Sequence, residues 1–371
     1  MSLQYKISEE IMERIHNFSA GPGVLPEEVL LEIQQDLLSY KGKGLSVMEM
    51  SHRSNEYVEI FNETVATMKR ILKIGDDYEV LFLGGGAHTQ FLMTAMNLIQ
   101  EGKVGNYVLT GEWATKAYKE AKKIGKLTHV AASSEDKNFS YLPKVFNISE
   151  NPAFLHYCSN NTIFGTEYRD DTIFPTNIPL ICDMSSDFMS RPLDTKKYAL
   201  IYAGAQKNIG PAGATAVIIR KDIISSFNAG LPTMLDYKTH IDKESMYNTP
   251  PTFPIYIIGL VLKWIEKQGL EAIEANNIAK AKLIYDAIDS SDFYKGTTAK
   301  EDRSLMNITF RLPSEEMEDK FVKEAKALKI SGIKGHRSVG GCRASTYNAL
   351  PIKACEVLAE FMMDFQKKNR T

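Results

Sequence analysis

One lysine of this chain stands in an unusual setting. Lys207 lies in an uncharged, glycine-rich stretch at residues 203–213, between two apolar runs. The small neighbours would let another group approach the backbone closely. Desolvation in such a turn favours the neutral amine, which is the form that attacks a carbonyl to give a Schiff base. The stretch therefore predicts a nucleophilic amine, and the alternative is an exposed lysine in a turn.

A carboxylate and an aromatic ring follow two other apolar runs. Asp183 comes directly after residues 179–182, where a buried charge is costly unless it meets a positive partner. A protonated pyridine nitrogen would be such a partner, and otherwise Asp183 caps a surface loop. Trp113, one of two tryptophans, could stack on a planar ring or pack in the core. Thr162, after a further run, indicates almost nothing alone.

A glycine turn at residues 84–86 precedes a helical pattern. Free backbone N–H groups and the positive end of a helix dipole suit a phosphate. The turn matches neither of the glycine-rich nucleotide-binding motifs, G-x-x-x-x-G-K-[ST] and G-x-G-x-x-G. It therefore predicts a phosphate cradle, or else a turn that lets the helix pack on a sheet.

Cationic side chains form a second group. His52 and Arg53 are adjacent near the amino terminus, and His336 and Arg337 are adjacent near the carboxyl terminus, followed by Arg343. Arginine holds carboxylates and phosphates bidentately, so repeated pairs of this kind indicate a dianionic substrate. The alternative is a solvated basic surface. The seven histidines have no metal-ligand spacing, so we expect no metal site.

The chemical candidates lie where predicted strands end. Helical patterns at residues 90–100 and 113–124 alternate with short apolar runs, which predicts an α/β fold with a mostly parallel sheet covered on both faces. Ligands of such sheets sit beyond the carboxyl ends of the strands. The predicted strands are residues 80–83, 107–109, 153–157, 179–182, 200–202 and 214–219.

The two ends of the chain flank this region. A helix is expected at residues 26–40, with Leu30, Ile33 and Leu37 on its apolar face. Prolines at 250, 251 and 254 break the pattern, and a helix at 255–267 leads toward a smaller domain. That domain is expected to contain helices at 276–288 and 353–367, a strand at 305–310 and a turn at 332–341.

Composition bounds the class of partner. The 371 residues carry a net charge of −2, which draws the chain to neither nucleic acid nor an anionic membrane. Small-molecule partners are therefore expected. Four scattered cysteines favour a reducing compartment. Residues 1–17 lack the apolar core of a signal peptide, and residues 253–262 are too short to span a bilayer, so a cytoplasmic location is expected.

In combination, these segments resemble the class V aminotransferases, and within them the phosphoserine aminotransferase family. The resemblance implies the fold type I of pyridoxal-phosphate-dependent transferases. This fold has a large domain with a mostly parallel seven-stranded sheet, here residues 17–258, and a smaller α/β domain, here residues 1–16 and 259–371. The segments that carry the resemblance are residues 17–23, 50–54, 84–91, 203–213, 248–253 and 335–345.

The resemblance also implies roles around the cofactor, pyridoxal 5′-phosphate. Lys207 would carry it as a covalent Schiff base, Asp183 would face its ring nitrogen, Trp113 would stack on the ring and Thr162 would bind the phenolic oxygen. Its phosphate would be held by Ala87, His88 and Gln206, and by Asn248 and Thr249 of a neighbouring subunit. A homodimer with shared active sites is therefore implied. The turn at residues 84–90 departs from the family form, so His88 could instead be a surface side chain.

For substrates, the resemblance implies that Arg343 takes the α-carboxylate, while His52, Arg53, His336 and Arg337 serve a phosphate or side-chain carboxylate. The implied reaction interconverts O-phospho-L-serine and 2-oxoglutarate with 3-phosphohydroxypyruvate and L-glutamate in serine biosynthesis. The substrate of the phosphohydroxythreonine step of vitamin B6 synthesis has the same charged groups.

Three other functions fit these residues less well. An alanine–glyoxylate aminotransferase would have little use for two His-Arg pairs. A cysteine desulfurase needs a mobile catalytic cysteine, whereas the resemblance implies that Cys342 is a packing residue. A non-catalytic binding protein is disfavoured by the presence of both Lys207 and Asp183.

Overall fold

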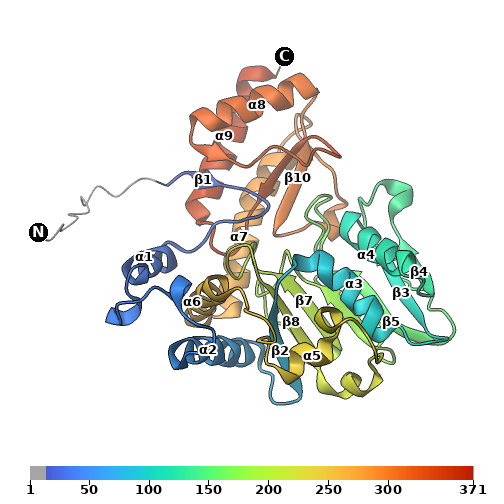
Figure 1. The fold of residues 1–371 in the computed structure, drawn as a ribbon. Coiled ribbons are helices and arrows are strands. Elements are labelled where there is room, and N and C mark those ends of the chain that lie inside the picture. The colour runs from blue at the N-terminus through green and yellow to red at the C-terminus, as the bar shows by residue number, and fades with distance from the viewer. Residues whose placement is uncertain (1–13, 371) are drawn as a thin grey trace, which may run out of the picture.

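Seven strands form the main sheet, in the order β2-β8-β7-β6-β5-β3-β4 (Figure 1). All of them point the same way except β8, which pairs antiparallel with both of its neighbours. A computed structural model describes residues 14–370 of the chain. The strands are β2 (Tyr78–Leu83), β3 (Val104–Leu109), β4 (Thr128–Ser133), β5 (Pro152–Cys158), β6 (Leu180–Asp183), β7 (Leu200–Gly204) and β8 (Thr215–Arg220).

Helices cover both faces of this sheet. Successive side chains of a strand point to opposite faces. In β2, Val80 and Phe82 join one hydrophobic cluster, whereas Leu81 and Leu83 join another. The first cluster includes residues of α1 (Glu27–Asp36), α2 (Asn55–Leu72) and α6 (Thr252–Gln268), and the second includes residues of α3 (Gly86–Leu98), α4 (Glu112–Lys123) and α5 (Tyr237–Asp242). The expected α/β class with a mostly parallel seven-stranded sheet is confirmed.

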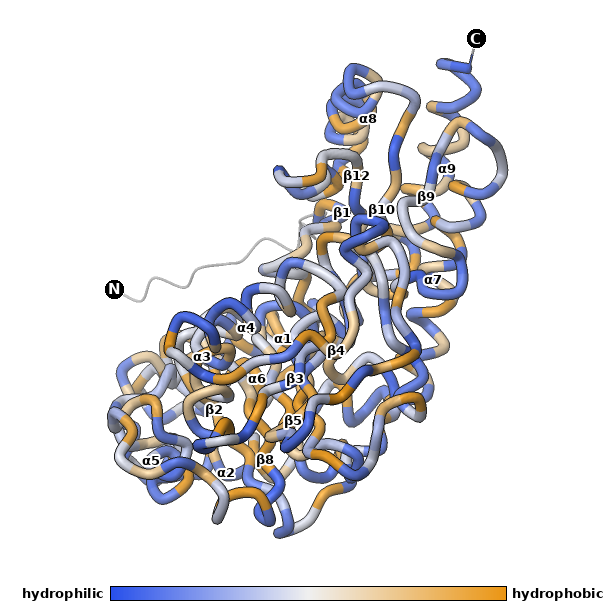
Figure 2. The backbone as a smooth tube through the Cα atoms, turned by 90° about the vertical axis from the view of Figure 1, so that its right-hand side faces the viewer, coloured by the Kyte–Doolittle hydropathy of each residue, from blue (hydrophilic) through white to orange (hydrophobic). Residues whose placement is uncertain are grey.

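A smaller layered unit lies at the top of Figure 1, beyond one edge of the main sheet. Its antiparallel sheet has β10 (Asn307–Arg311) between β9 (Lys295–Gly296) and β12 (Cys342–Ser345). A separate hydrophobic cluster joins this sheet to three helices, α7 (Leu270–Asp289), α8 (Glu315–Ala327) and α9 (Ile352–Asn369). In Figure 2 the hydrophobic colour gathers along the strands of the main sheet, whereas α8 and the outer turns are largely hydrophilic.

The chain enters beside this smaller unit. β1 (His16–Asn17) pairs with β11 (Ile330–Ser331), and Phe18 and Val24 join the cluster of the smaller unit. The division at residue 258 remains a prediction, and residues 1–13, assigned to the small domain, lie outside the described part. Because Ile255–Ile265 packs with the main sheet, we propose that the boundary lies after α6. Within residues 14–370, no helix combines the length and apolar character needed to cross a membrane.

Local differences from the sequence-based expectation have simple causes. Each expected strand of the main sheet is present, with ends shifted by up to three residues. The helix expected at residues 26–40 ends at Asp36, where Leu37 is 37% exposed and Val29 supplies the buried contact instead. The elements that were not predicted include α2, α5, α8 and β12. Strand β4 was also not predicted, since it is a half-buried edge strand whose short apolar run gives little signal.

Candidate active site

A cavity of about 320 Å³ lies beyond the carboxyl ends of β5, β6 and β7. Parallel strands bring the residues that follow them to one edge of the sheet, so segments far apart in sequence meet here. His336 and Arg343 of the smaller unit also line the cavity. The predicted site residues that line it are Ala87, His88, Trp113, Thr162, Asp183, Gln206, Lys207, His336 and Arg343.

Lys207 reaches the cavity from the turn after β7. Its Nζ donates hydrogen bonds to Thr162 Oγ1 at 2.9 Å and to Ser186 Oγ at 2.7 Å. Burial lowers the pKa of the Lys207 amine, against the opposing effect of the Asp183 carboxylate. Gly21 passes beside this side chain with a φ of 143°, a backbone conformation that favours glycine. The lysine is therefore a partly buried amine at the cavity wall, and not an exposed lysine in a turn.

Asp183 is the last residue of β6 and is only 3% exposed. One carboxylate oxygen accepts a hydrogen bond from the Ser185 backbone N–H at 2.9 Å. Burial raises the pKa of Asp183, while the Ser185 N–H and the positive charges of Lys207 and His88 act in the opposite direction. A carboxylate buried at a cavity wall favours a cationic group of a ligand as its partner.

Aromatic rings and a helix start form another wall. The His88 ring meets the Trp113 ring edge-on, with centroids 5.7 Å apart. Trp113 Nε1 is buried without a hydrogen-bond partner among the described residues. Helix α3 begins at Gly86 after Gly85, which has a φ of 89° that favours glycine, and no side chain caps the helix. Its first N–H groups are therefore available to an anion.

Arg343 and His336 come from the smaller unit. Arg343 lies on β12, and one of its terminal nitrogens donates to the Thr162 carbonyl oxygen at 3.1 Å. Its Nε is buried and has no partner among the described residues. Burial, together with the charges of Arg343 and Arg337, lowers the pKa of His336. Arg343 therefore offers a partly unused guanidinium group to an anionic ligand.

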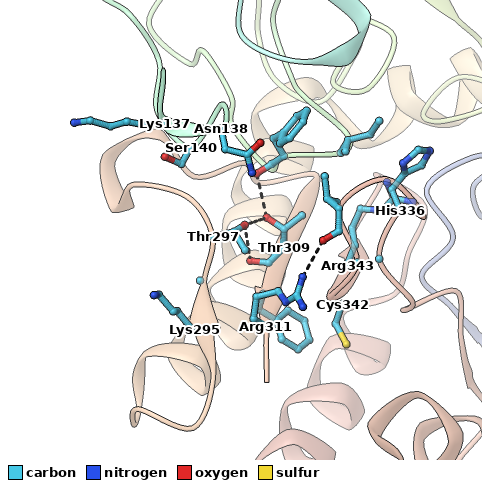
Figure 3. Close-up of a pocket in the computed structure, with 17 residues that line it drawn as sticks. Lys137, Asn138, Ser140, Lys295, Thr297, Thr309, Arg311, His336, Cys342 and Arg343 are labelled. Carbon is cyan, nitrogen blue, oxygen red and sulfur yellow. Dashed lines mark hydrogen bonds between the residues drawn. The ribbon is translucent and has the colours of Figure 1, made fainter. Parts of the chain in front are cut away.

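A second cavity of about 380 Å³ adjoins the first and shares Ile163, His336 and Arg343 with it. Figure 3 shows this second cavity, with Lys137 from the loop after β4 above it and β10 with its neighbours below it. Among its basic residues, Arg311 is already paired with Glu318 at 2.6 Å and donates to the Val339 carbonyl oxygen. The two cavities thus meet at the side chains expected to bind substrate.

Five predicted site residues lie outside the Lys207 cavity of their own chain. Asn248 and Thr249 line a different cavity, beside the glycine turn at residues 84–85. His52 and Arg53 lie in the turn before α2, and neither lines the Lys207 cavity. Arg337 is exposed and absent from its walls, although its neighbour His336 lines it. A single chain therefore brings together the residues expected around a cofactor ring but only part of the expected anion-binding set.

Known proteins show a similar architecture and sequence. The family model for class V aminotransferases matches residues 15–357. A phosphoserine aminotransferase of Desulfatibacillum aliphaticivorans is 56% identical, over 96% of this chain and 99% of its own. The chain belongs to the phosphoserine aminotransferase family of class V. As a member of this family, it is a pyridoxal-phosphate-dependent aminotransferase.

Solved structures agree with this assignment. A phosphoserine aminotransferase from Bacillus circulans subsp. alkalophilus superposes with a TM-score of 0.93 at 50% identity, covering 96% of this chain and 99% of that one. One from Trichomonas vaginalis, with pyridoxal phosphate bound, has a TM-score of 0.89 at 38% identity, covering 94% and 100%. The fold of the aminotransferase is therefore that of its family along nearly its whole length.

The residues of this aminotransferase fit the cofactor of its family. The cavity offers a buried carboxylate for a ring nitrogen, an amine for an aldehyde, and an uncapped helix start for a phosphate. The unpartnered Nε1 of Trp113 and Nε of Arg343 indicate that ligands complete the site. The cavity thus has a donor set matched to pyridoxal phosphate and an anionic amino acid.

Several lining residues were missed from the sequence. Ser185 and Ser186 follow Asp183 directly, and Phe91 lies in the first turns of α3. The rule that ligands lie beyond strand ends could have found the two serines, but nothing distinguished them from other loop serines. Cys158 also lines the cavity, yet burial raises the pKa of its thiol well above the usual value. It is therefore a poor nucleophile, unlike the cysteine that a desulfurase needs.

Cys342 is equally unsuited to desulfuration. It is 2% exposed, lies opposite Phe310 in the small sheet, and does not line the Lys207 cavity. Burial raises the pKa of its thiol, so the group stays protonated. A packing role for Cys342 follows from these contacts.

Proposed function

We propose that this aminotransferase interconverts O-phospho-L-serine and 2-oxoglutarate with 3-phosphohydroxypyruvate and L-glutamate, in the synthesis of serine. The observation that carries the proposal is the meeting of Lys207 and Arg343 in one cavity, in a chain 56% identical to a phosphoserine aminotransferase. An amine that exchanges with the substrate and a guanidinium that binds its carboxylate are the minimum requirements of an amino acid site. The phosphohydroxythreonine step of vitamin B6 synthesis is proposed as a second activity. A cytoplasmic location is proposed with it.

The cofactor of this proposal is pyridoxal phosphate, linked as a Schiff base to Lys207. When bound, it supplies an electron sink for the negative charge that develops at the substrate Cα. Asp183 would keep the ring nitrogen protonated, Trp113 would stack on the ring and Thr162 would bind the phenolic oxygen. The phosphate would lie at the start of α3, held by Ala87, His88 and Gln206. The uncapped helix start and the burial of Asp183 support these roles.

Lys207 is proposed as the group that moves the proton. Its Nζ must be neutral to accept a proton from Cα, and burial of the amine favours the neutral form. Arg343 orients the substrate by its α-carboxylate, which places Cα rather than the side chain near this nitrogen.

The anionic end of the substrate needs further cations. His336 lines the cavity and Arg337 follows it, so both are proposed to bind the phosphate or the side-chain carboxylate. His52 and Arg53 lie outside the cavity of their own chain. If they act on substrate, they act in the site of a second subunit. The same holds for Asn248 and Thr249, which are proposed to complete the phosphate site of the partner, so the proposed assembly is a homodimer.

Mixed dimers test the sharing of sites. Neither Lys207→Ala nor the double variant Asn248→Ala/Thr249→Ala should turn over substrate well alone. After subunit exchange, half of the dimers are mixed, and each has one intact site, so activity should recover to about a quarter of the original. Recovery is measured as the rate of glutamate formation. As a control, Lys207→Ala is mixed with Asp183→Asn. Both residues of a site come from the same chain, so no mixed dimer has an intact site and activity should not recover. If the mixture with Asn248→Ala/Thr249→Ala recovers no more activity than this control, and the protein has the mass of a monomer, the sharing of sites is refuted.

An absorption spectrum tests the reaction itself. The visible band of the bound cofactor is recorded before and after O-phospho-L-serine is added, with L-alanine as the control amine. We expect phosphoserine to remove the band at micromolar to millimolar concentrations, in the usual range of KM values, and alanine to leave it. Addition of 2-oxoglutarate should then restore it. If alanine alone removes the band, the cofactor chemistry stands but the assignment of phosphoserine fails.

A further inference from the structure

Ser186 makes the shorter of the two hydrogen bonds to the Lys207 amine. Its Oγ lies 2.7 Å from Lys207 Nζ, and Thr162 Oγ1 lies 2.9 Å from the same nitrogen. The two hydroxyl oxygens are 2.6 Å apart, so the three groups form a closed triangle of hydrogen bonds. Ser186 is 3% exposed and Thr162 is 4% exposed. The reacting nitrogen is thus held by two buried hydroxyls.

Ser186 is itself held from two parts of the chain. Asn208, the residue after the lysine, donates through Nδ2 to the Ser186 carbonyl oxygen at 3.1 Å. Asn208 Oδ1 in turn accepts from the Asn348 backbone N–H at 3.0 Å. Asn348 also donates through Nδ2 to the Met189 carbonyl oxygen at 2.8 Å. The serine therefore sits in a fixed turn, with its hydroxyl directed at the amine.

The two hydroxyls differ in what else they must do. In the proposed function, Thr162 also binds the phenolic oxygen of the cofactor, which takes up part of its hydrogen-bonding capacity. The Ser186 hydroxyl has no hydrogen bond other than those to Lys207 and Thr162 among the described residues. It remains available to the lysine amine whenever that amine is free.

We propose that Ser186 is a further catalytic residue, whose hydroxyl accepts a hydrogen bond from the free Lys207 amine and holds it in the position from which it exchanges protons with the substrate. This inference rests on the proposed role of Lys207. An acceptor oxygen stabilises the ammonium form of an amine. The Ser186 hydroxyl should therefore oppose the effect of burial on the Lys207 pKa, as the Asp183 carboxylate does. Without Ser186 the amine is both less basic and less well placed.

Chemical labelling of the protein without cofactor measures the first effect. The protein is treated with trinitrobenzenesulfonate, which modifies neutral amines, over a range of pH. Labelling at Lys207 is measured by peptide mass spectrometry. In Ser186→Ala, the midpoint of labelling should move down by about one pH unit, because the ammonium form loses a hydrogen-bond acceptor. Ser190→Ala is the matched control: it is a buried serine of the same turn whose hydroxyl has no hydrogen bond among the described residues, so its midpoint should not move.

The holoenzyme measures the second effect. Ser186→Ala should lower kcat about ten- to a hundredfold with little change in the KM for phosphoserine, as expected when proton transfer is impaired and binding is not. The isotope effect with α-deuterated phosphoserine should rise, because proton transfer then limits the rate. Ser186→Cys preserves the shape with a weaker acceptor and should be intermediate. It also serves as the second variant if Ser186→Ala unfolds at a much lower temperature.

Opposite results would overturn the proposal. Folded Ser186→Ala and Ser186→Cys are compared with the original protein and with Ser190→Ala. If their labelling midpoints differ by less than about 0.3 pH units, a twofold change in the acidity constant, and their kcat values by less than about twofold, Ser186 has no role at the amine. Failure of the proposed substrate is seen separately, because labelling needs neither cofactor nor phosphoserine. In that case the unmodified holoenzyme would not respond to phosphoserine, while the shift at Lys207 would remain.

Discussion

Replacing Lys207 by alanine should lower kcat for transamination about 10⁴-fold or more, since the same nitrogen serves as cofactor anchor and proton carrier. No other described amine lines the cavity. Neither Thr162 nor Ser186, the two groups that bind Lys207 Nζ, can replace a base of its strength, because unactivated hydroxyls are far weaker bases. The rate is measured as glutamate formation from phosphoserine and 2-oxoglutarate.

Three controls separate this chemical loss from damage to the fold. Lys196→Ala removes an exposed lysine from a short 3-10 helix and should leave the rate unchanged. Lys207→Ala should keep the far-ultraviolet circular dichroism of the original and still bind pyridoxal phosphate without a covalent link. Added methylamine should restore part of the rate, because the truncated side chain leaves room for a small amine. A variant that keeps more than about a hundredth of the original kcat would show that Lys207 is not the proton carrier.

Replacing Asp183 by asparagine should lower kcat about 10²- to 10³-fold, a cost typical of removing one group that stabilises developing charge. Asparagine has nearly the same shape but carries no negative charge to hold a ring nitrogen in its protonated form. Steady-state kcat with saturating phosphoserine measures the loss. Asp187→Asn is the matched control: it removes another buried carboxylate of the same region, which lies outside the cavity walls, and should cost less than about tenfold.

The stability of the cofactor-free protein should change in the opposite direction. Because burial raises the pKa of Asp183, the folded protein binds this proton more tightly than the unfolded chain does. Stability contributed by the group is therefore present at low pH and lost as pH rises from about 4, the unfolded pKa, through the folded pKa. At pH 7, cofactor-free Asp183→Asn should unfold at a temperature at least as high as the original. A variant that is both inactive and strongly destabilised would mean that Asp183 serves the fold rather than the cofactor.

The two predictions together separate the aminotransferase from a binding protein with the same fold. A binding protein would tolerate both substitutions with its ligand affinity intact. In this chain, the amine and the carboxylate line one cavity and have pKa values shifted in opposite directions, an arrangement that is costly to maintain without chemistry to perform.

Much of this site could be read from the sequence because its residues follow strands. Asp183 and Lys207 come directly after short apolar runs, and parallel strands deliver such residues to the same edge of a sheet. The cofactor roles of Thr162, Ala87 and Gln206 came from the resemblance alone. The structure brings all of them to one cavity, while their roles at the cofactor remain predictions.

The sequence also determined the class of the fold. The alternation of apolar runs with helical patterns is a local property, set by which residues face the core every second or every third to fourth position. Elements at the periphery of the fold were predicted less well. Strand β4 is only half-buried and therefore lacks a strong apolar signal. The helix after residue 26 ends at Asp36, before the partly exposed Leu37.

Only the tertiary structure decided which distant groups meet. Arg343 reaches Thr162 across 181 positions of sequence, and Ser186 became significant only when its hydroxyl proved to lie 2.7 Å from Lys207 Nζ. Conversely, His52 and Arg53 turned out to lie outside the cavity of their own chain. Local patterning specifies the strands and helices, because it depends on neighbours a few residues apart. The contacts of a site depend on how whole elements pack, which no short stretch of sequence encodes.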